Sequence, residues 1–99
     1  MRILEQEEIV RQLTDYPDWS GGAEALTRVY TAADFPAAVT LVDRVAVVAE
    51  EMNHHPDIDI RWRTLRFRVS THSAGGVTDL DLELARRIEH LIAGSGTQS

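Results

Sequence analysis

Apolar residues recur three or four positions apart in the middle of the chain, at Phe35, Ala38, Val42, Val45, Ala49 and Met52. This is the period of an amphipathic α-helix with one face against a core. Asp34 directly precedes the run and suits an N-cap, and Pro36 is tolerated in a first helical turn. Pro56 has no amide hydrogen and disfavours a helical conformation at the residue before it, so the helix is predicted to end at His54 or His55.

After Pro56 the period changes to two. Two runs alternate apolar with polar residues, the first with Ile58, Ile60 and Trp62, and the second with Leu65, Phe67 and Val69. Alternation of this kind is typical of strands that bury one face. The apolar parity changes between Trp62 and Leu65, so we expect a turn or bulge there that joins the strands of residues 57–71 as a tight hairpin.

The remaining elements follow from the same two periods. Residues 2–14 are predicted to form a helix, and residues 26–31 a strand with a short partner near Trp19. We interpret the Trp19 side chain as a core anchor in preference to part of a binding wall. Thr78 and Asp81 are spaced as a capping box before a last helix that Gly94 is expected to end. The order is α-β-β-α-β-β-α, an α+β fold with an antiparallel sheet in one domain of residues 1–93 and a disordered tail, 94–99.

Composition limits the possible functions. The chain has 99 residues, no cysteine and a net charge of -6, and charged residues interrupt every long apolar run. We therefore expect a cytoplasmic protein without a membrane segment, and one that does not bind nucleic acid. Four of the ten basic residues cluster on the predicted hairpin, at Arg61, Arg63, Arg66 and Arg68. This cluster indicates solvated strand faces or, alternatively, an anion site or a subunit contact.

Three of the four histidines lie between Glu50 and His72. Histidine suits general acid and base catalysis because its ordinary pKa of about 6.5 is close to neutral pH. Glu50 and His54 are one helical turn apart, so the carboxylate is expected to accept a hydrogen bond from the imidazole.

A metal site is the main chemical alternative. Glu51 and His54 have the Glu-x-x-His spacing of carboxylate-bridged iron sites, and further ligands are available at His55, Asp57, Asp59 and His72. A di-iron site requires a second such motif, which the chain lacks, and a helix end and an extended residue point in different directions. We therefore expect no metal.

The complete motif is a glutamate, three residues, His-His-Pro, five residues, an aromatic residue, nine residues, a histidine and a downstream aspartate. It is filled by Glu50, His54, His55, Pro56, Trp62, His72 and Asp81. With the flanking residues Asp34 and Phe35 and the segment THSAGGVT before the last helix, it resembles the pterin-4a-carbinolamine dehydratases over roughly residues 19–91. The resemblance implies a four-stranded antiparallel sheet with helices on one face, assembly into homodimers or homotetramers, a pterin substrate and no bound cofactor.

The resemblance also implies catalytic roles. His54 and His72 would be the acid and base, in an order left open, and His55 would bind substrate and stabilise developing charge. Glu50 would orient His54. Asp81 would polarise a neighbouring histidine or hold the loop after His72.

Trp62 and the backbone around Ser70 and Thr71 would line the substrate site. Simpler interpretations accompany several of these roles: Glu50 as a surface charge, Asp81 as a capping residue and Trp62 as a core residue. His90, on the last helix and outside the motif, is interpreted as a surface residue.

Two functions follow. The first is a dehydratase that converts 4a-hydroxytetrahydropterin to quinonoid dihydropterin and water, in support of pterin recycling. The second is a non-catalytic protein-binding or assembly module of the same fold, because a fold alone does not determine function. The complete set of histidines favours the enzyme.

Overall fold

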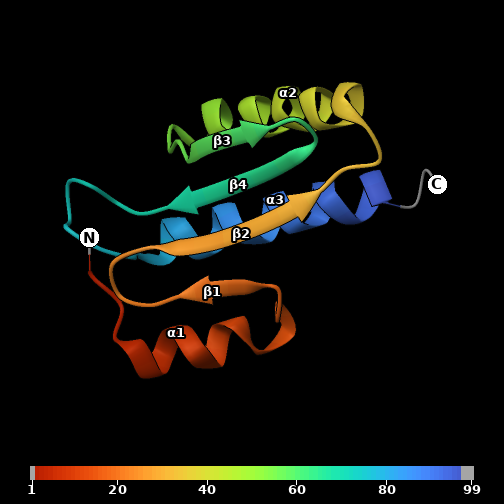
Figure 1. Cartoon of the computed structure of the whole chain (residues 1–99). Coiled ribbons are helices and arrows are strands. Elements are labelled where there is room, and N and C mark those ends of the chain that lie inside the picture. Colours follow the sequence, from red (N-terminus) through yellow and green to blue (C-terminus); the bar gives the residue numbers. More distant parts are fainter. Residues whose placement is uncertain (1, 97–99) are drawn as a thin grey trace.

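The computed structural model describes residues 2–96, which form the predicted order of three α-helices and four β-strands (Figure 1). The elements are α1 (Gln6–Gln12), β1 (Trp19–Gly21), β2 (Leu26–Thr31), α2 (Phe35–Met52), β3 (Asp57–Arg61), β4 (Thr64–Val69) and α3 (Asp79–Gly96). The α+β prediction is confirmed, including the short strand that begins at Trp19. No helix in residues 2–96 is long and apolar enough to cross a membrane.

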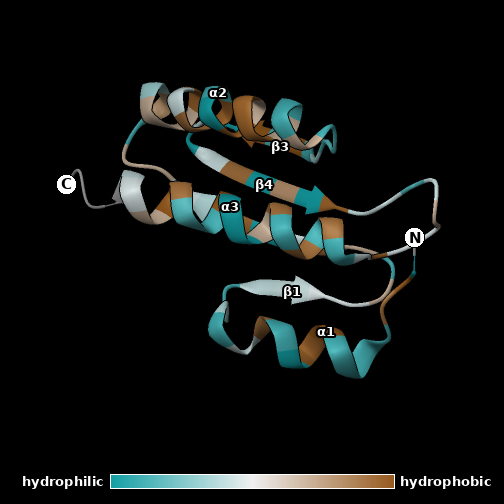
Figure 2. Cartoon of the chain, turned by 180° about the vertical axis from the view of Figure 1, so that it is seen from behind, coloured by the Kyte–Doolittle hydropathy of each residue, from teal (hydrophilic) through white to brown (hydrophobic). Residues whose placement is uncertain are grey.

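The strands form one antiparallel sheet in the order β1-β2-β4-β3. On β4, the buried residues Leu65 and Phe67 alternate with the exposed residues Arg66 and Arg68, so only one face is covered. The covering layer contains α2 and α3, which lie in front of the sheet when the molecule is seen from behind (Figure 2). This confirms helices on one face and leaves β3 as an edge strand with β4 as its only neighbour.

The core lies between the sheet and the helices. Its largest fully buried side chains come from the N-terminal segment, α1, the sheet, α2, the segment before α3, and α3: Phe67, Leu4, Ile9, Leu26, Leu41, Leu65, Leu84, Ile88, Val45, Val69, Val77 and Thr78. Trp19 is 4% exposed and packs in this cluster, which confirms its interpretation as a core residue.

A charged contact ties α3 to the first two strands. Glu89 Oε1 accepts hydrogen bonds from Arg28 Nε and Trp19 Nε1, each at 2.9 Å. Burial favours the neutral acid, but these hydrogen bonds and the charge of Arg28 together lower the pKa of Glu89 below its ordinary value. The carboxylate therefore stays charged in the packed layer and holds α3 on the sheet.

The start of α2 is as predicted, but the helix ends two or three residues before the predicted end at His54 or His55. Asp34 Oδ1 accepts a hydrogen bond from the Ala37 amide at 2.8 Å, and Pro36 lies in the first turn. The helix ends at Met52 because Asn53 adopts a left-handed conformation with φ 50°. Asparagine tolerates this conformation, which is a common way to end a helix.

Two other helix boundaries differ from the predictions. Residues 2–5 are not helical; the Leu4 amide instead donates to the Val77 carbonyl at 2.8 Å, which ties this segment to the start of α3. A 3-10 helix, Leu13–Asp15, follows α1. Gly94 does not end α3, which continues to Gly96, so residues 94–96 of the expected disordered tail are helical and residues 97–99 lie outside the described residues.

The β3–β4 hairpin is confirmed, but its turn comes earlier than predicted. β3 ends at Arg61, and Trp62 and Arg63 form the turn, so Trp62 is not a strand residue. Its φ of 54° is uncommon for a side-chain-bearing residue, and its side chain is exposed. The residue after β2 holds this turn in place, because the Ala32 amide donates to the Arg63 carbonyl at 2.8 Å.

Candidate active site

The histidines gather at one end of the hairpin because its strands are antiparallel. Asp57, the first residue of β3, pairs with Arg68 near the end of β4. His54 and His55 therefore precede β3 at the same end of the sheet at which His72 follows β4. Asp81, in the first turn of α3, joins them from the helical layer.

His54 is held by a buried carboxylate. Its Nε2 lies 2.6 Å from Asp81 Oδ1, and the side chains are 11% and 0% exposed respectively. A carboxylate has no proton to give, so Nε2 is the donor of this hydrogen bond. The aspartate therefore fixes both the ring orientation and the tautomer of His54, and Nδ1 is the ring nitrogen without a hydrogen when the ring is neutral.

Asp81 uses its second oxygen to join the neighbouring segments. Oδ2 accepts from the Thr78 amide at 2.9 Å and from the Thr71 hydroxyl at 2.7 Å. The predicted capping box is thus present, since Thr78 Oγ1 also accepts from the Leu80 amide at 3.3 Å. The capping interpretation and the histidine-polarising interpretation of Asp81 both have their contacts in the structure.

Glu50 contacts a different histidine from the one expected. Its Oε2 lies 2.5 Å from Nε2 of His55, and both side chains are largely exposed. The expected pairing with His54 required the helix to continue, but the left-handed Asn53 turns the chain one residue earlier. The role of Glu50 as the partner of His54 was therefore wrong, and Asp81 takes that place.

His72 lies in a loop closed by the bridge between Thr71 and Gly76. Gly75 has φ 82° in this turn, a conformation that favours glycine, and its amide donates to the His72 carbonyl at 3.1 Å. Within residues 2–96, the His72 side chain is exposed and makes no hydrogen bond or ion pair. Its imidazole is available to a ligand.

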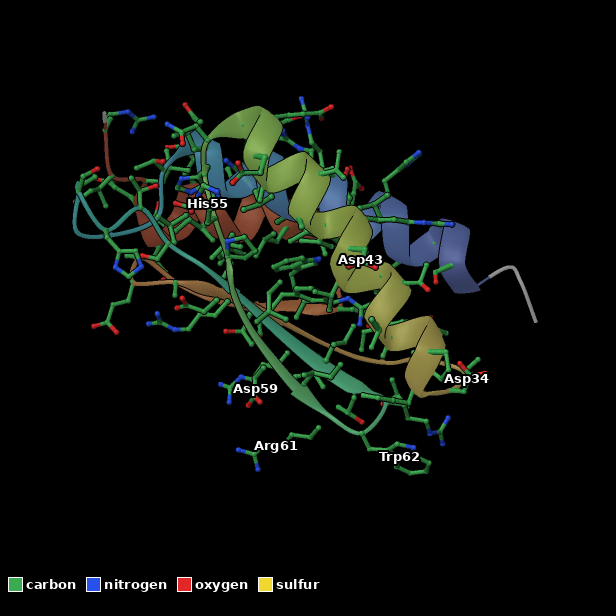
Figure 3. All side chains as sticks on the ribbon, turned by 90° about the horizontal axis from the view of Figure 1, so that it is seen from above. Asp34, Asp43, His55, Asp59, Arg61 and Trp62 are labelled. Carbon is green, nitrogen blue, oxygen red and sulfur yellow. The ribbon has the colours of Figure 1, made fainter. Side chains whose placement is uncertain are left out.

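The residues expected to line the site are not all brought together. Ser70 and Thr71 lie beside His72, with the Ser70 hydroxyl donating to the Glu24 carbonyl at 2.7 Å and the Thr71 side chain buried. Trp62 lies at the opposite end of the hairpin from His55 (Figure 3). A strand of this length separates them by roughly 17 Å, so Trp62 does not line the site of its own chain.

Most of the groups considered for metal binding have other partners. Glu51 Oε1 is 3.6 Å from Arg87 Nη1. Over residues 2–96, no group of three or more His, Cys, Asp or Glu side chains is placed to hold a metal ion. In the arginine cluster, Arg61 pairs with Asp59 and Arg68 with Asp57 on the open face of the sheet.

Comparison with known proteins identifies the family of this chain. The family model described as pterin 4 alpha carbinolamine dehydratase matches residues 2–91. A Nocardia farcinica protein, provisionally named as such a dehydratase, is 54% identical over 89 residues, which cover 90% of this chain and 94% of that protein. A similarly named Streptomyces coelicolor protein is 46% identical over 94% of this chain and 93% of its own length. The chain belongs to the pterin 4 alpha carbinolamine dehydratase family.

Solved structures agree with this family assignment. A Brucella melitensis structure described as a transcriptional coactivator/pterin dehydratase matches with TM-score 0.85 and 30% identity, over 91% of this chain and 98% of its own. A pterin dehydratase-like RuBisCO assembly factor of the alpha-carboxysome matches with TM-score 0.61 and 16% identity, over 74% and 84%. The second match shows the shared fold alone.

Sequence reasoning missed the side chains that hold the dehydratase-family motif together. Thr71 was considered for its backbone and Thr78 as a cap, yet their hydroxyls lie 2.8 Å apart and one of them bonds to Asp81. The spacing of Thr71, Thr78 and Asp81 contains the signal, because a carboxylate that is buried in the first turn of a helix requires nearby donors.

Replacement of Asp81 tests this arrangement. Asp81→Asn replaces one of the two oxygens that serve three donors with an NH2 group, which cannot accept, and we expect the free energy of unfolding to fall by about 1–3 kcal/mol. Urea denaturation at neutral pH measures the change. Asp79→Asn is the matched control, because Asp79 lies exposed in the same helical turn. Equal stability of the two variants would contradict a structural role for the Asp81 contacts.

Proposed function

We propose that this chain is a dehydratase that converts 4a-hydroxytetrahydropterin to quinonoid dihydropterin and water. The observation that supports the proposal is the pairing of His54 with a fully buried Asp81, beside an unpaired His72, in a member of this family. We propose a cytoplasmic location and a role in pterin recycling with it, on the resemblance and the absence of cysteine.

The reaction removes a proton at one position of the pterin and adds one at another, and it involves no oxidation. The ring nitrogen next to C4a loses its proton, the bond from C4a to the hydroxyl oxygen breaks, and the hydroxyl leaves as water after protonation. A base and an acid are sufficient, and histidine serves as either near neutral pH. The chemistry calls for no cofactor.

The three histidines divide these tasks by their surroundings. His54 has one ring nitrogen tied to Asp81, so its other nitrogen exchanges a proton with the substrate from a fixed direction. His72 is the second proton carrier from the loop. His55, with Glu50 as its acceptor, is exposed and suited to hydrogen bonding the flat pterin and stabilising developing charge.

Variants of the histidines test the enzyme directly. His54→Ala and His72→Ala are each expected to lower kcat by about 10²–10⁴-fold, since each removes a general acid or base. His55→Ala should mainly raise KM. The assay follows the absorbance of freshly generated 4a-hydroxytetrahydropterin, with chelator-treated protein and with His90→Ala as the control.

The outcomes separate the alternatives. Wild-type turnover that survives the chelator and is lost in His54→Ala and His72→Ala supports acid/base dehydration. Turnover lost to the chelator would favour a metal site. Wild-type rates in both histidine variants would refute the assigned roles, and the absence of any acceleration by wild type would favour the binding module.

Self-association is the second part of the proposal, and exposed apolar side chains support it. α2 exposes Phe35, Val39 and Val47, β3 exposes Ile60, and the turn after β3 exposes Trp62, at 72%. α2 lies beside β3 at one side of the molecule (Figure 1). Apolar side chains concentrated at an unpaired sheet edge are typical of a contact surface.

A second copy of the chain suits this edge because the sequence of β3 is self-complementary. In an antiparallel pairing centred on Ile60, Asp59 of one chain faces Arg61 of the other. In the same pairing, the partner's Trp62 lies opposite Ile58, about 5 Å away across the contact between the two chains. Ile58 is near the end of the sheet at which the histidines gather. Trp62 would then line the neighbouring site, which its own fold does not allow.

Disruption of this edge tests the assembly. Ile60→Asp sets two carboxylates against each other at the centre of the pairing, and we expect the sedimentation coefficient to fall to that of a single chain. Val10→Asp on α1, an exposed apolar position away from the edge, is the control. Wild-type protein that sediments as a monomer at all concentrations would end this part of the proposal.

The second candidate function is a protein-binding module. The same exposed apolar face of α2 favours it, as does the coactivator description of the Brucella structure, which concerns that protein. A pull-down that recovers a stoichiometric partner, together with absent dehydratase activity, would support this candidate over the enzyme.

A further inference from the structure

A directed chain of hydrogen bonds runs from the start of α3 to His54. Thr71 Oγ1 lies 2.7 Å from Asp81 Oδ2 and 2.8 Å from Thr78 Oγ1. The carboxylate accepts only, so the single hydroxyl hydrogen of Thr71 points to Asp81. The Thr78 hydroxyl must then donate to Thr71, while it accepts from the Leu80 amide. Every donor in the chain thus points toward the Asp81 carboxylate.

This direction determines what His54 presents to a ligand. Asp81 Oδ2 is occupied by the Thr71 hydroxyl and the Thr78 amide, so Oδ1 is the oxygen left for His54 Nε2. The carboxylate cannot turn out of its present plane without breaking the hydrogen bonds from two buried donors, the Thr71 hydroxyl and the Thr78 amide. Asp81 is therefore fixed in the orientation that holds a hydrogen on Nε2.

We propose that Thr71 is a positioning residue that acts through Asp81 to keep His54 in the Nε2–H tautomer, so that Nδ1 is the nitrogen that exchanges the substrate proton. The inference rests on the proposed dehydratase function for its catalytic consequence, and on the hydrogen bonds alone for its structural part. Thr71 is buried at 6% exposure, and its hydroxyl is engaged with Asp81 and Thr78.

The alternative is that Thr71 only fills a buried polar position. A hydroxyl with no effect beyond packing would change stability when removed and leave the tautomer of His54 unchanged. The two roles are therefore separated by a spectroscopic measurement on the histidine rather than by stability.

The experiment compares Thr71→Val, Thr71→Ser and wild type, each labelled with ¹⁵N-histidine. Thr71→Val keeps the shape and removes the hydroxyl, whereas Thr71→Ser retains it. Thr31→Val is the matched control, because its hydroxyl contacts Thr64 on an exposed strand end away from the histidines. The ¹⁵N shifts of the His54 ring nitrogens and the dehydration kinetics are measured for each protein.

We expect His54 of wild type, Thr71→Ser and Thr31→Val to show one Nε2–H tautomer at a pH where the ring is neutral. In Thr71→Val the two tautomers should mix and kcat should fall by about 10- to 100-fold, as for other residues that orient a functional histidine, with KM little changed. A wild-type kcat in Thr71→Ser would show that the hydroxyl of residue 71 is responsible for the effect.

Several results would overturn the inference. An Nδ1–H tautomer in wild type would refute it without any variant, even if Thr71→Val failed to fold. An unchanged tautomer and kcat in folded Thr71→Val would also refute it. A wild-type protein that has the Nε2–H tautomer but no dehydratase activity would instead refute the proposed function and leave the hydrogen-bond direction intact.

Discussion

The arrangement of the site depends on one buried carboxylate. Asp81 is fully buried and accepts hydrogen bonds from His54, Thr71 and the Thr78 amide. These partners belong to the connection before β3, the segment after β4 and the segment before α3. A carboxylate is costly to bury unless its hydrogen bonds are complete, so the three segments must meet in this geometry for the chain to fold. The hydrogen bonds that hold these segments together in the fold are therefore the same ones that orient His54.

Much of the fold was predictable because its signals are local. The helical period of α2, its Asp34 cap and the alternation along β3 and β4 each depend on residues close in sequence. The capping relation of Thr78 and Asp81 is of the same kind. The candidate site was predictable as a group for a related reason: a hairpin brings together the residues just before and just after it.

The errors concern single turns, the continuation of a helix and a contact between distant segments, none of which the apolar periods report. The partner of His54 was taken from helical spacing, but a left-handed Asn53 interrupts that spacing and tertiary packing supplies Asp81 from 27 positions away. Trp62 was predicted as a strand residue of the site, whereas the turn at the hairpin tip includes it and exposes it. Gly94 does not interrupt α3. One glycine costs a helix only about 1 kcal/mol, which neighbouring contacts can offset.

The fold by itself is compatible with catalysis and with assembly. The carboxysome assembly factor shares the fold at 16% identity, and the Brucella structure is described as a transcriptional coactivator/pterin dehydratase. What favours catalysis here is the site: an oriented His54, an unpaired His72 and an exposed His55 at one end of the sheet.

The central claim, that these three histidines form a pterin site, is tested most directly by binding. A stable dihydropterin that cannot react is titrated into ¹⁵N-histidine-labelled protein, and the ring resonances are followed. The account predicts that the resonances of His54, His55 and His72 shift with one common dissociation constant while those of His90 stay in place. Saturable binding that moves none of the three, or that moves His90 alone, would contradict it.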